Sequence, residues 1–413
     1  MKKLLKVLLY IFLGIVTVFG ALTTVNFVNS IVMYKYVDSF SPVEKEGALT
    51  PEYDEDGVPY FVTDGDFKVL HLTDVHIGGG VLSAGNDRKA INAVAAMVTA
   101  EKPDLVVVTG DVSFAIPTTG TLNNSYAHSY FIRLMERLGV YWTVTFGNHD
   151  SEKYNYYGRQ DVASMYGDES LEYCLFSSGP SDVYGECNHV INVRNSLGII
   201  TRSLVMIDTN SYTEDDPIGL GWDYDTIRES QIEWYSDTIG KYTAYNNDIL
   251  SSLPEESVPS DTSAFTTVKS MMFMHIPIRE VRDAYNEYVN NNRQNTENTT
   301  FIGGNDGETD KVVYCPEEDE EMFETVLALG STEALFYGHD HLNNFVLVYK
   351  GVTFSYGYSI DYLAYFGIDG KGYQRGCTVL TLSPDGRFTI THENYYQDKY
   401  PSLYDKEEVD LSK

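Results

Sequence analysis

Residues 141–150 read YWTVTFGNHD, an apolar, strand-forming run that ends in the polar cluster Gly147-Asn148-His149-Asp150. The pattern recurs at four other places, where strand-like runs end at Asp74-Val75-His76, Gly110-Asp111, His275 and Gly338-His339-Asp340-His341. In α/β folds, the loops at the carboxyl ends of strands meet at one edge of the sheet, so we expect these side chains to converge. Converging carboxylate, amide and imidazole donors predict two divalent metal ions that share one ligand.

Strand-like and helix-like segments alternate along the chain from Phe67 onward. Short apolar runs predict strands, and apolar residues three to four positions apart predict helices. The expected strands are residues 67–72, 105–108, 141–146, 203–207, 270–274 and 334–337, and the expected helices are residues 86–101, 126–138, 228–240 and 319–329. This alternation predicts a layered α/β fold. Two long segments, 151–195 and 286–310, are expected to be loops, either lids or exposed filler.

The N-terminus predicts a membrane-spanning segment. Three lysines within the first six residues precede an uncharged stretch from Val7 to Tyr34. Its most apolar part, residues 7–25, matches the roughly 20 residues that span a bilayer as a helix. Lysines before it and acidic residues after it predict a single-pass cell-membrane protein with an extracytoplasmic body. The alternative is a signal peptide cleaved after small residues near Val18 and Gly20, followed by secretion.

Composition suggests four parts along the chain. Residues 1–36 are the expected transmembrane anchor, residues 37–65 a linker or the lead-in to an edge strand, residues 66–400 one folded domain, and residues 401–413 an acidic tail. The formal net charge of −31 disfavours nucleic-acid binding, because an acidic surface repels the phosphate backbone. It does not exclude a phosphate substrate, since bound metal reverses the local sign of charge.

The cysteines and the remaining histidines are expected to have structural roles. None of the four cysteines lies in a Cys-x-x-Cys spacing, so a zinc or redox motif is not favoured; they are Cys174, Cys187, Cys315 and Cys377. In an exported body, Cys174 and Cys187 either form a disulfide or remain reduced, half-buried thiols. His71, inside a strand, is expected in the core, and the isolated histidines are expected at the surface: His128, His189 and His392.

The ordered clusters resemble those of the calcineurin-like metallophosphoesterase superfamily, from about residue 67 to residue 341 and by extension to the end of the chain. The resemblance implies a four-layer sandwich of two mixed β-sheets flanked by α-helices, and dinuclear metal-dependent hydrolysis of phosphate esters. Further motifs resemble its purple-acid-phosphatase-like branch, which includes yeast and plant phosphatases; they are residues 221–223, 230–235, 275–278, 338–344 and 375–377.

The resemblance also implies a role for each polar residue. Seven would be metal ligands: Asp74, His76 and His341 for the first metal, Asn148, His275 and His339 for the second, and Asp111 as the bridge. A hydroxide held between the metals would attack phosphorus in line. His149 would lie beside the phosphate as a general acid or to stabilise charge, and Asp150 would orient His149 through a hydrogen bond. Mixed N and O ligands suit Mn, Fe, Zn or Ni.

This chain departs from some members of the superfamily. Purple acid phosphatases have a ligand Tyr three residues after the bridging Asp, and here that residue is Phe114, which disfavours a tyrosinate-coloured ferric site. The Asp-Arg-Gly of calcineurin-type protein phosphatases is also missing, since residues 112–115 read VSFA. Asp208 and Asn210 end another strand and are expected to support the site rather than to bind metal.

The sequence is compatible with three functions. The first is a membrane-anchored, exported phosphoesterase. The second is a phosphodiesterase acting on cyclic nucleotides or on lipid or cell-envelope phosphates, because leaving-group choice depends on the long loops. The third is a catalytically silent binding protein of the same fold, which would be expected to lack some of the ligands.

Overall fold

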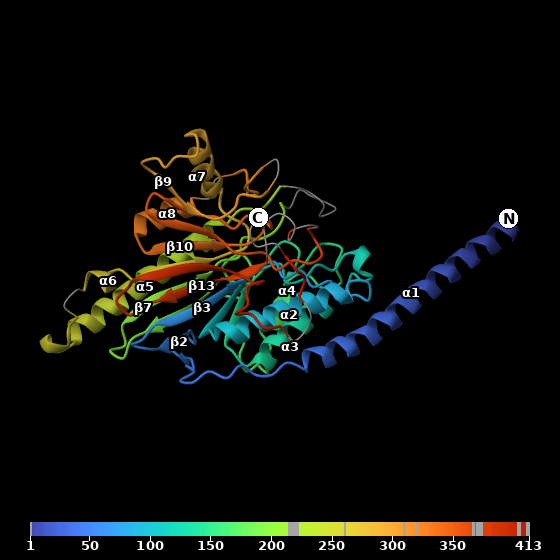
Figure 1. Ribbon diagram of the computed structural model, residues 1–413, viewed down its shortest axis with the longest axis horizontal. Helices are drawn as coiled ribbons and strands as arrows, with labels where there is room; N and C mark the ends of the chain where they lie inside the picture. Colours follow the sequence, from blue (N-terminus) through green and yellow to red (C-terminus); the bar gives the residue numbers. More distant parts are fainter. Residues whose placement is uncertain are drawn as a thin grey trace.

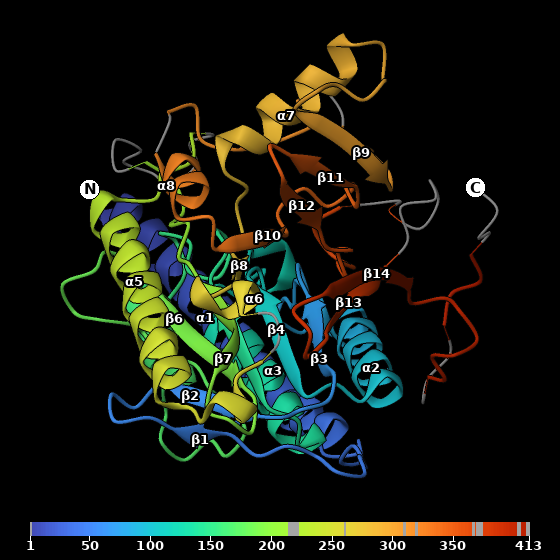
Figure 2. The ribbon, with the colours of Figure 1, turned by 90° about the vertical axis from the view of Figure 1, so that its left-hand side faces the viewer.

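Two mixed β-sheets packed face to face form the centre of the computed structural model (Figures 1 and 2). The structure describes residues 2–213, 223–259, 262–308, 311–318, 321–365, 368, 375–402 and 406–409. The nine-stranded sheet has the order β1-β2-β6-β7-β8-β10-β12-β11-β9, and the five-stranded sheet has the order β14-β13-β3-β4-β5.

The strands of the nine-stranded sheet, in that order, are β1 (Glu52–Tyr53), β2 (Pro59–Val62), β6 (His189–Arg194), β7 (Ile200–Met206), β8 (Ser270–Phe273), β10 (Thr332–Tyr337), β12 (Val352–Tyr356), β11 (Val346–Tyr349) and β9 (Thr299–Gly303). Those of the five-stranded sheet are β14 (Phe388–Asn394), β13 (Gly376–Leu382), β3 (Phe67–Leu72), β4 (Leu105–Thr109) and β5 (Trp142–Thr145).

Helices cover the outer face of each sheet. Against the five-stranded sheet lie α2 (Ala84–Glu101), α3 (Ser125–Leu138) and α4 (Arg159–Tyr166), and the C-terminal end of α1 (Lys2–Val37) packs on α2 and α3. Against the nine-stranded sheet lie α5 (Glu229–Ser252), α7 (Arg279–Asn290) and α8 (Met322–Leu329), with the short α6 (Ser263–Thr266) beside α5. Single 3₁₀ turns occupy Pro117–Thr119 and Glu255–Ser257.

Alternation along each strand explains the four layers. In β3, Phe67 and Val69 face the other sheet, whereas Leu70 and Leu72 face the helices. Successive side chains of a strand point to opposite faces, so a strand buried on both faces supplies two separate apolar layers. The expected four-layer sandwich of two mixed sheets flanked by helices is therefore confirmed.

Most expected elements lie where the sequence placed them, with differences in one helix and in the two long segments. The helix expected to end at Gly240 continues to Ser252, because the buried stripe of Tyr235, Ile239 and Tyr242 continues to Asn246 at helical spacing. The two long segments expected to be loops are not only loop: segment 151–195 contains α4 and β6, and segment 286–310 contains the end of α7 and all of β9. The Gly221-Trp222 pair of the expected branch motif lies outside the described residues.

The segment expected as a linker contributes to the larger sheet. Within residues 37–65, β2 pairs in parallel with β6, and β1 pairs with β2 at the edge of the sheet. The edge-strand alternative therefore describes this segment better than a free linker. Before it, α1 is the one helix of the described chain that is long and apolar enough to cross a membrane, and a signal sequence would meet the same criterion.

Two expectations for isolated side chains are wrong. His128 and His189 were expected at the surface but are buried, because each ring satisfies both nitrogens internally. His128 bonds Tyr166 and a main-chain carbonyl, and His189 bonds Thr143 and the Cys187 carbonyl. His71 is in the core, as expected. All four cysteines are free thiols, and those that are buried are Cys187, Cys315 and Cys377.

Candidate metal centre

The carboxyl ends of five strands bring the polar clusters together. β3, β4 and β5 run parallel in one sheet, and β8 and β10 run parallel in the other. The two sheets meet at this edge, where Nδ1 of His275, after β8, lies 2.7 Å from the carbonyl of Thr109 in β4. All seven residues expected as metal ligands follow these strand ends: Asp74, His76, Asp111, Asn148, His275, His339 and His341.

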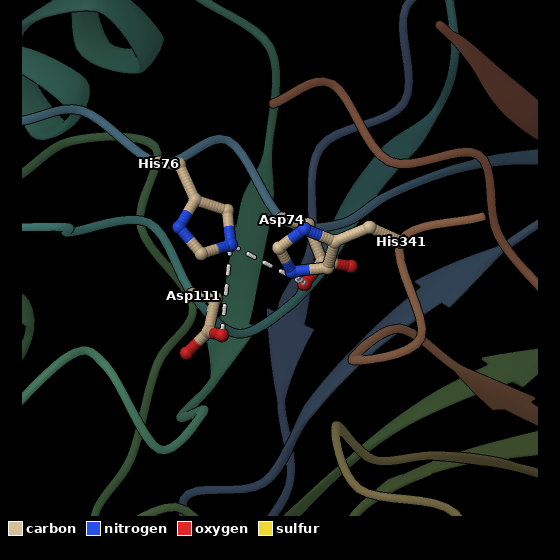
Figure 3. Close-up of side chains that lie close together, drawn as sticks. All are labelled: Asp74, His76, Asp111 and His341. Carbon is tan, nitrogen blue, oxygen red and sulfur yellow. Dashed lines mark ion pairs between the residues drawn. The ribbon is translucent and has the colours of Figure 1, made fainter. Parts of the chain in front are cut away.

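One group of possible ligands consists of Asp74, His76, Asp111 and His341, whose donor atoms all lie within 4.8 Å of one another (Figure 3). Nε2 of His76 is 3.6 Å from a carboxylate oxygen of Asp74 and 3.6 Å from one of Asp111. Nε2 of His341 is 3.5 Å from Asp74. Four side chains from three loops thus surround a space suited to one cation.

A second group consists of Asp111, His275 and His339, again with all donor atoms within 4.8 Å. Nε2 of His275 lies 3.1 Å from Oδ2 of Asp111. The Nδ1 atom of His275 is 2.7 Å from the Thr109 carbonyl, which fixes the proton on Nδ1 and leaves Nε2 for a metal. Asp111 belongs to both groups, the position that a bridging ligand requires.

Unsatisfied donor atoms show that the cluster suits cations. Within the described chain, these buried atoms have no hydrogen-bond partner: Nε2 of His76, His275 and His339, Oδ2 of Asp111 and Oδ1 of Asn148. The Asn148 amide donates to Tyr212 Oη at 2.9 Å, which leaves its oxygen free for a metal. Buried polar atoms without partners are costly, and divalent cations would satisfy this mixture of imidazole, carboxylate and amide donors.

The backbone at the cluster is strained. Asp74, His76 and Asp111 have φ of 51°, and His339 has φ of 74°, in the left-handed region that side chains other than Gly rarely adopt. Each such residue costs on the order of 1 to 3 kcal/mol and persists where surrounding contacts fix it. Here the main-chain N–H of His76 donates to the Asp111 carbonyl at 3.0 Å, joining the first two loops.

Charge pairing accompanies this geometry. Burial opposes the ionised form of Asp111, but His275 and other imidazoles beside it hold the pKa of this carboxyl well below its usual range. Burial likewise opposes protonation of His275, and Asp111 outweighs it and raises the pKa of His275 to about 9. Asp111 is therefore an anion at neutral pH, as metal ligation requires.

A residue that the sequence analysis missed, Asp361, supports His341. Oδ2 of Asp361 lies 3.3 Å from Nδ1 of His341, and its carboxylate accepts hydrogen bonds from the main-chain N–H groups of residues 363–365. The amide bonds fix the carboxylate, and the carboxylate fixes the imidazole. The signal was present in the sequence, because Asp361 follows the apolar strand β12 by a few residues.

The expected hydrogen bond from Asp150 to His149 is a further error. The Asp150 carboxylate instead accepts from the main-chain N–H groups of Asp111, Ser113 and Gly147 at 2.8–3.0 Å. Among described residues, Nδ1 of His149 has Glu152 as its carboxylate partner, with Oε1 at 2.9 Å. Although Asp150 is adjacent to His149 in sequence, its carboxylate faces the backbone of the loops after β4 and β5. Glu152, rather than Asp150, therefore orients the His149 ring.

Asp208 supports the site through Arg159, in agreement with expectation. Nε of Arg159 donates to Asp208 at 3.0 Å, and Nη1 of Arg159 donates to the Gly147 carbonyl at 3.2 Å. Asn210 donates to the Thr226 carbonyl at 2.7 Å. The Arg159–Asp208 pair thus holds the loop after β5. Arg159 belongs to α4, which lies in a segment expected from the sequence to be loop.

A cavity of about 440 Å³ opens above the cluster. Asp111, Asn148 and His149 form its floor, and a wall of aromatic side chains includes Phe114, Tyr154, Tyr212, Tyr224, Tyr314 and Tyr365. The ring of Phe114 lies 5.0 Å from that of His149 and 5.1 Å from that of His76. Phe114 thus packs against the site without offering an oxygen to a metal.

Known proteins are similar to this chain in sequence. The sequence model of the calcineurin-like phosphoesterase family matches residues 67–343. Probable inactive purple acid phosphatase 28 of Arabidopsis thaliana is 25% identical over 335 residues, 74% of this chain and 73% of that protein. Phosphatase DCR2 of Saccharomyces cerevisiae is 26% identical over 337 residues, 76% of this chain and 49% of that protein.

Among solved structures, a dimetal phosphatase from Danio rerio aligns at 13% identity with a TM-score of 0.47, covering 81% of this chain and 98% of that one. The family match is the decisive comparison, because it covers well over half of the chain and contains every strand-end cluster from Asp74 to His341. The chain belongs to the calcineurin-like phosphoesterases, in the purple-acid-phosphatase-like branch that its motifs predicted.

Proposed function

We propose that the protein is a dinuclear metal-dependent phosphoesterase, anchored by α1 in the cell membrane with its catalytic domain outside the cytoplasm. The observation that carries the proposal is the shared position of Asp111 in two groups of buried ligands. Asp74, His76 and His341 would hold one divalent cation, Asn148, His275 and His339 would hold the other, and Asp111 would bridge them.

The bound cations would lower the pKa of water and neutralise phosphate oxygens. The protein's own groups do the rest. His149, with Nδ1 held by Glu152, keeps Nε2 for the phosphate or for the leaving oxygen. Asp111 also accepts the main-chain N–H of His149 at 2.8 Å, which ties the position of this imidazole to the metal centre.

A second candidate is a catalytically silent binding protein. Relatives such as probable inactive purple acid phosphatases 28 and 29 of Arabidopsis thaliana bear names that favour it. The intact set of seven ligand residues favours the enzyme instead, since a silent protein has no need for all of them. A phosphodiesterase with the same centre is the third candidate, because one cavity of this size accommodates either class of ester.

The experiment that separates these candidates uses the purified full chain, freed of metal by chelation and then supplied with Mn²⁺. An aryl phosphate and a bis-aryl phosphate are offered in parallel. Metal-dependent turnover of the monoester supports the proposal, and preference for the diester supports a phosphodiesterase. Metal binding without turnover of either ester supports the silent protein.

Topology needs its own test. Protease added to intact cells should digest the domain if it is exported, and a protected domain would contradict the proposed orientation. The mass of the mature protein separates an uncleaved anchor from a cleaved signal peptide.

A further inference from the structure

The C-terminal end of α1, residues 26–37, is fixed to the catalytic domain. Met33 and Val37 are fully buried against α2 and α3. Arg133 forms a two-fold ion pair with Asp38, at 2.6 and 2.8 Å, directly after the helix. Apolar packing and an ion pair act on the same end of the helix, so the direction of α1 relative to the domain is set (Figure 1).

Asn26 marks the place where α1 leaves the domain. Residues 3–25 are exposed along their whole length. A helix of that length measures about 34 Å, close to the roughly 30 Å hydrocarbon core of a bilayer. Asn26 is buried, donates to the Gly120 carbonyl at 2.8 Å and accepts the main-chain N–H of Val81 at 2.9 Å. When residues 3–25 span a bilayer, Asn26 and its partners lie at the bilayer surface.

The metal centre is close to this place. Val81 follows the ligand residue His76 by five positions, and an extended chain covers at most about 3.6 Å per residue, so the two lie within roughly 18 Å. The intervening loop is fixed, because Gly78 and Gly79 donate their N–H groups to Asp87 at 2.8 and 3.1 Å. The ligands therefore lie on the side of the domain from which α1 leaves.

Apart from histidine, the loops that contact Asn26 carry no side chain that is charged near neutral pH. Residues 75–86 and 112–132 contain no Asp, Glu, Lys or Arg, in a chain in which 22% of residues are charged. Leu82 is 70% exposed and Tyr156 is 56% exposed. Tyr156 belongs to the same surface, since its N–H donates to the Leu122 carbonyl at 3.1 Å.

An uncharged surface of this kind suits a lipid interface. Exposed aromatic and aliphatic side chains are favoured at the headgroup level, where a charged surface of the wrong sign would be repelled. The rest of the protein is strongly acidic, with a net charge of −31 for the whole chain, and repels soluble phosphate anions. A phosphate ester held in the bilayer would reach the centre across a stretch of surface that lacks this charge.

We propose that the exposed parts of residues 81–86 and 116–123, together with Tyr156, form a lipid-facing rim that rests on the bilayer that α1 spans. The metal centre then hydrolyses a phosphate monoester whose alcohol is a membrane lipid. In the reaction, the oxygen of water bonds to phosphorus and the ester P–O bond breaks. The leaving oxygen takes a proton and remains in the bilayer as the lipid alcohol, and inorganic phosphate leaves to water. This substrate class rests on the proposed function.

Orientation is tested first, with the full chain in phosphatidylcholine vesicles. Leu82→Cys carries an environment-sensitive fluorophore, and Thr118→Cys places the same probe on the second loop of the rim. The matched control is Leu197→Cys, an exposed apolar position (38% exposed) in the β6–β7 turn, at the end of β7 opposite to the metal centre. Wild type measures background labelling of native thiols.

The rim probes should emit at shorter wavelength than the Leu197 probe and be quenched by spin-labelled lipid. Equal emission and equal quenching at all three positions would overturn the proposed orientation. Two rim variants are used so that one poorly folded variant does not decide the outcome.

Substrate class is tested with the same vesicles and Mn²⁺. Phosphatidic acid in the bilayer is compared with glycerol 3-phosphate and phenyl phosphate in solution. Confinement to the same surface should raise the rate for phosphatidic acid at least about tenfold over glycerol 3-phosphate at equal total concentration. Turnover of the soluble esters with no such preference would overturn the substrate class and leave the phosphoesterase intact. No turnover of any ester would overturn the phosphoesterase itself, and with it the substrate class.

Discussion

Oε1 of Glu152 lies 2.9 Å from Nδ1 of His149, the histidine that belongs to neither group of metal ligands. The contact fixes one imidazole nitrogen and leaves the other for chemistry. Two carboxylates that are close in sequence therefore have different roles. Glu152 acts on the catalytic imidazole, whereas Asp150 acts on the backbone of the ligand loops.

Glu152→Gln should lower kcat for an aryl phosphate by about tenfold to a hundredfold, because the imidazole loses its carboxylate partner. Metal content should be unchanged, since the side-chain partners of the Glu152 carboxylate are His149 and Tyr212, neither of which is a ligand residue. The measurement is steady-state kinetics alongside metal analysis by mass spectrometry. A variant with normal kcat would show that His149 needs no carboxylate.

Asp150→Asn should act on stability. The Asp150 carboxylate accepts three main-chain N–H groups, and an amide offers one oxygen and turns its NH₂ toward the remaining donors. Buried donors left without partners cost about 1 to 3 kcal/mol each, so we expect a loss of about 3 kcal/mol in the free energy of unfolding. Urea unfolding measures it. A fully stable Asp150→Asn with lowered kcat would restore the orienting role first expected for Asp150.

Asp361→Asn should weaken binding of one metal of the pair. His341 loses the carboxylate that fixes its ring, and loss of such a partner typically costs tenfold to a hundredfold in metal affinity. Calorimetric titration with Mn²⁺ should show one weakened and one unchanged binding step. The control is Asp385→Asn in a surface turn, whose carboxylate pairs with exposed Arg387. Equal weakening of both steps, or of neither, would contradict the assignment of His341 to one metal.

His189 should make the fold sensitive to acid. Burial lowers the pKa of His189 to about 4, while the unfolded side chain keeps a value near 6.5. The unfolded state therefore binds a proton that the folded state refuses, and stability falls as pH drops from about 6.5 toward 4. At pH 5 this contribution is about 2 kcal/mol relative to pH 7.

The check is urea unfolding of His189→Gln and wild type between pH 7 and 5. Gln has no proton to gain. The free energy of unfolding of the variant should therefore fall less steeply with pH, by a slope that corresponds to at most one proton taken up on unfolding. Parallel pH dependences would show that His189 is protonated in the folded protein as well.

The fold was accessible from the sequence because its strands are short apolar runs that each end in a polar cluster. Leu105–Thr109 is buried at every position, and such a run has few alternatives to a central strand. The C-terminal end of α5 was harder to predict. The expected helix ended at Gly240, but tertiary packing extends α5 to Ser252.

The ligand residues were accessible for the same reason, since a strand end fixes where a short loop must point. Their supporting partners were not, because side-chain pairing depends on distances that spacing does not give. Asp150 and Glu152 are both near His149 in sequence, and only the turn after β5 decides which of them faces the ring. Docking of α1 through Asn26 was equally hidden, because it joins segments far apart in the chain.

The most direct test of the central claim is a metal titration of the metal-free full chain, with the rate of aryl phosphate hydrolysis followed at each step. A dinuclear centre predicts negligible turnover at one equivalent of Mn²⁺, a rise on addition of the second, and loss of both tight binding and rate in Asp111→Asn. Full activity at a single bound metal, or two bound metals without turnover, would contradict it.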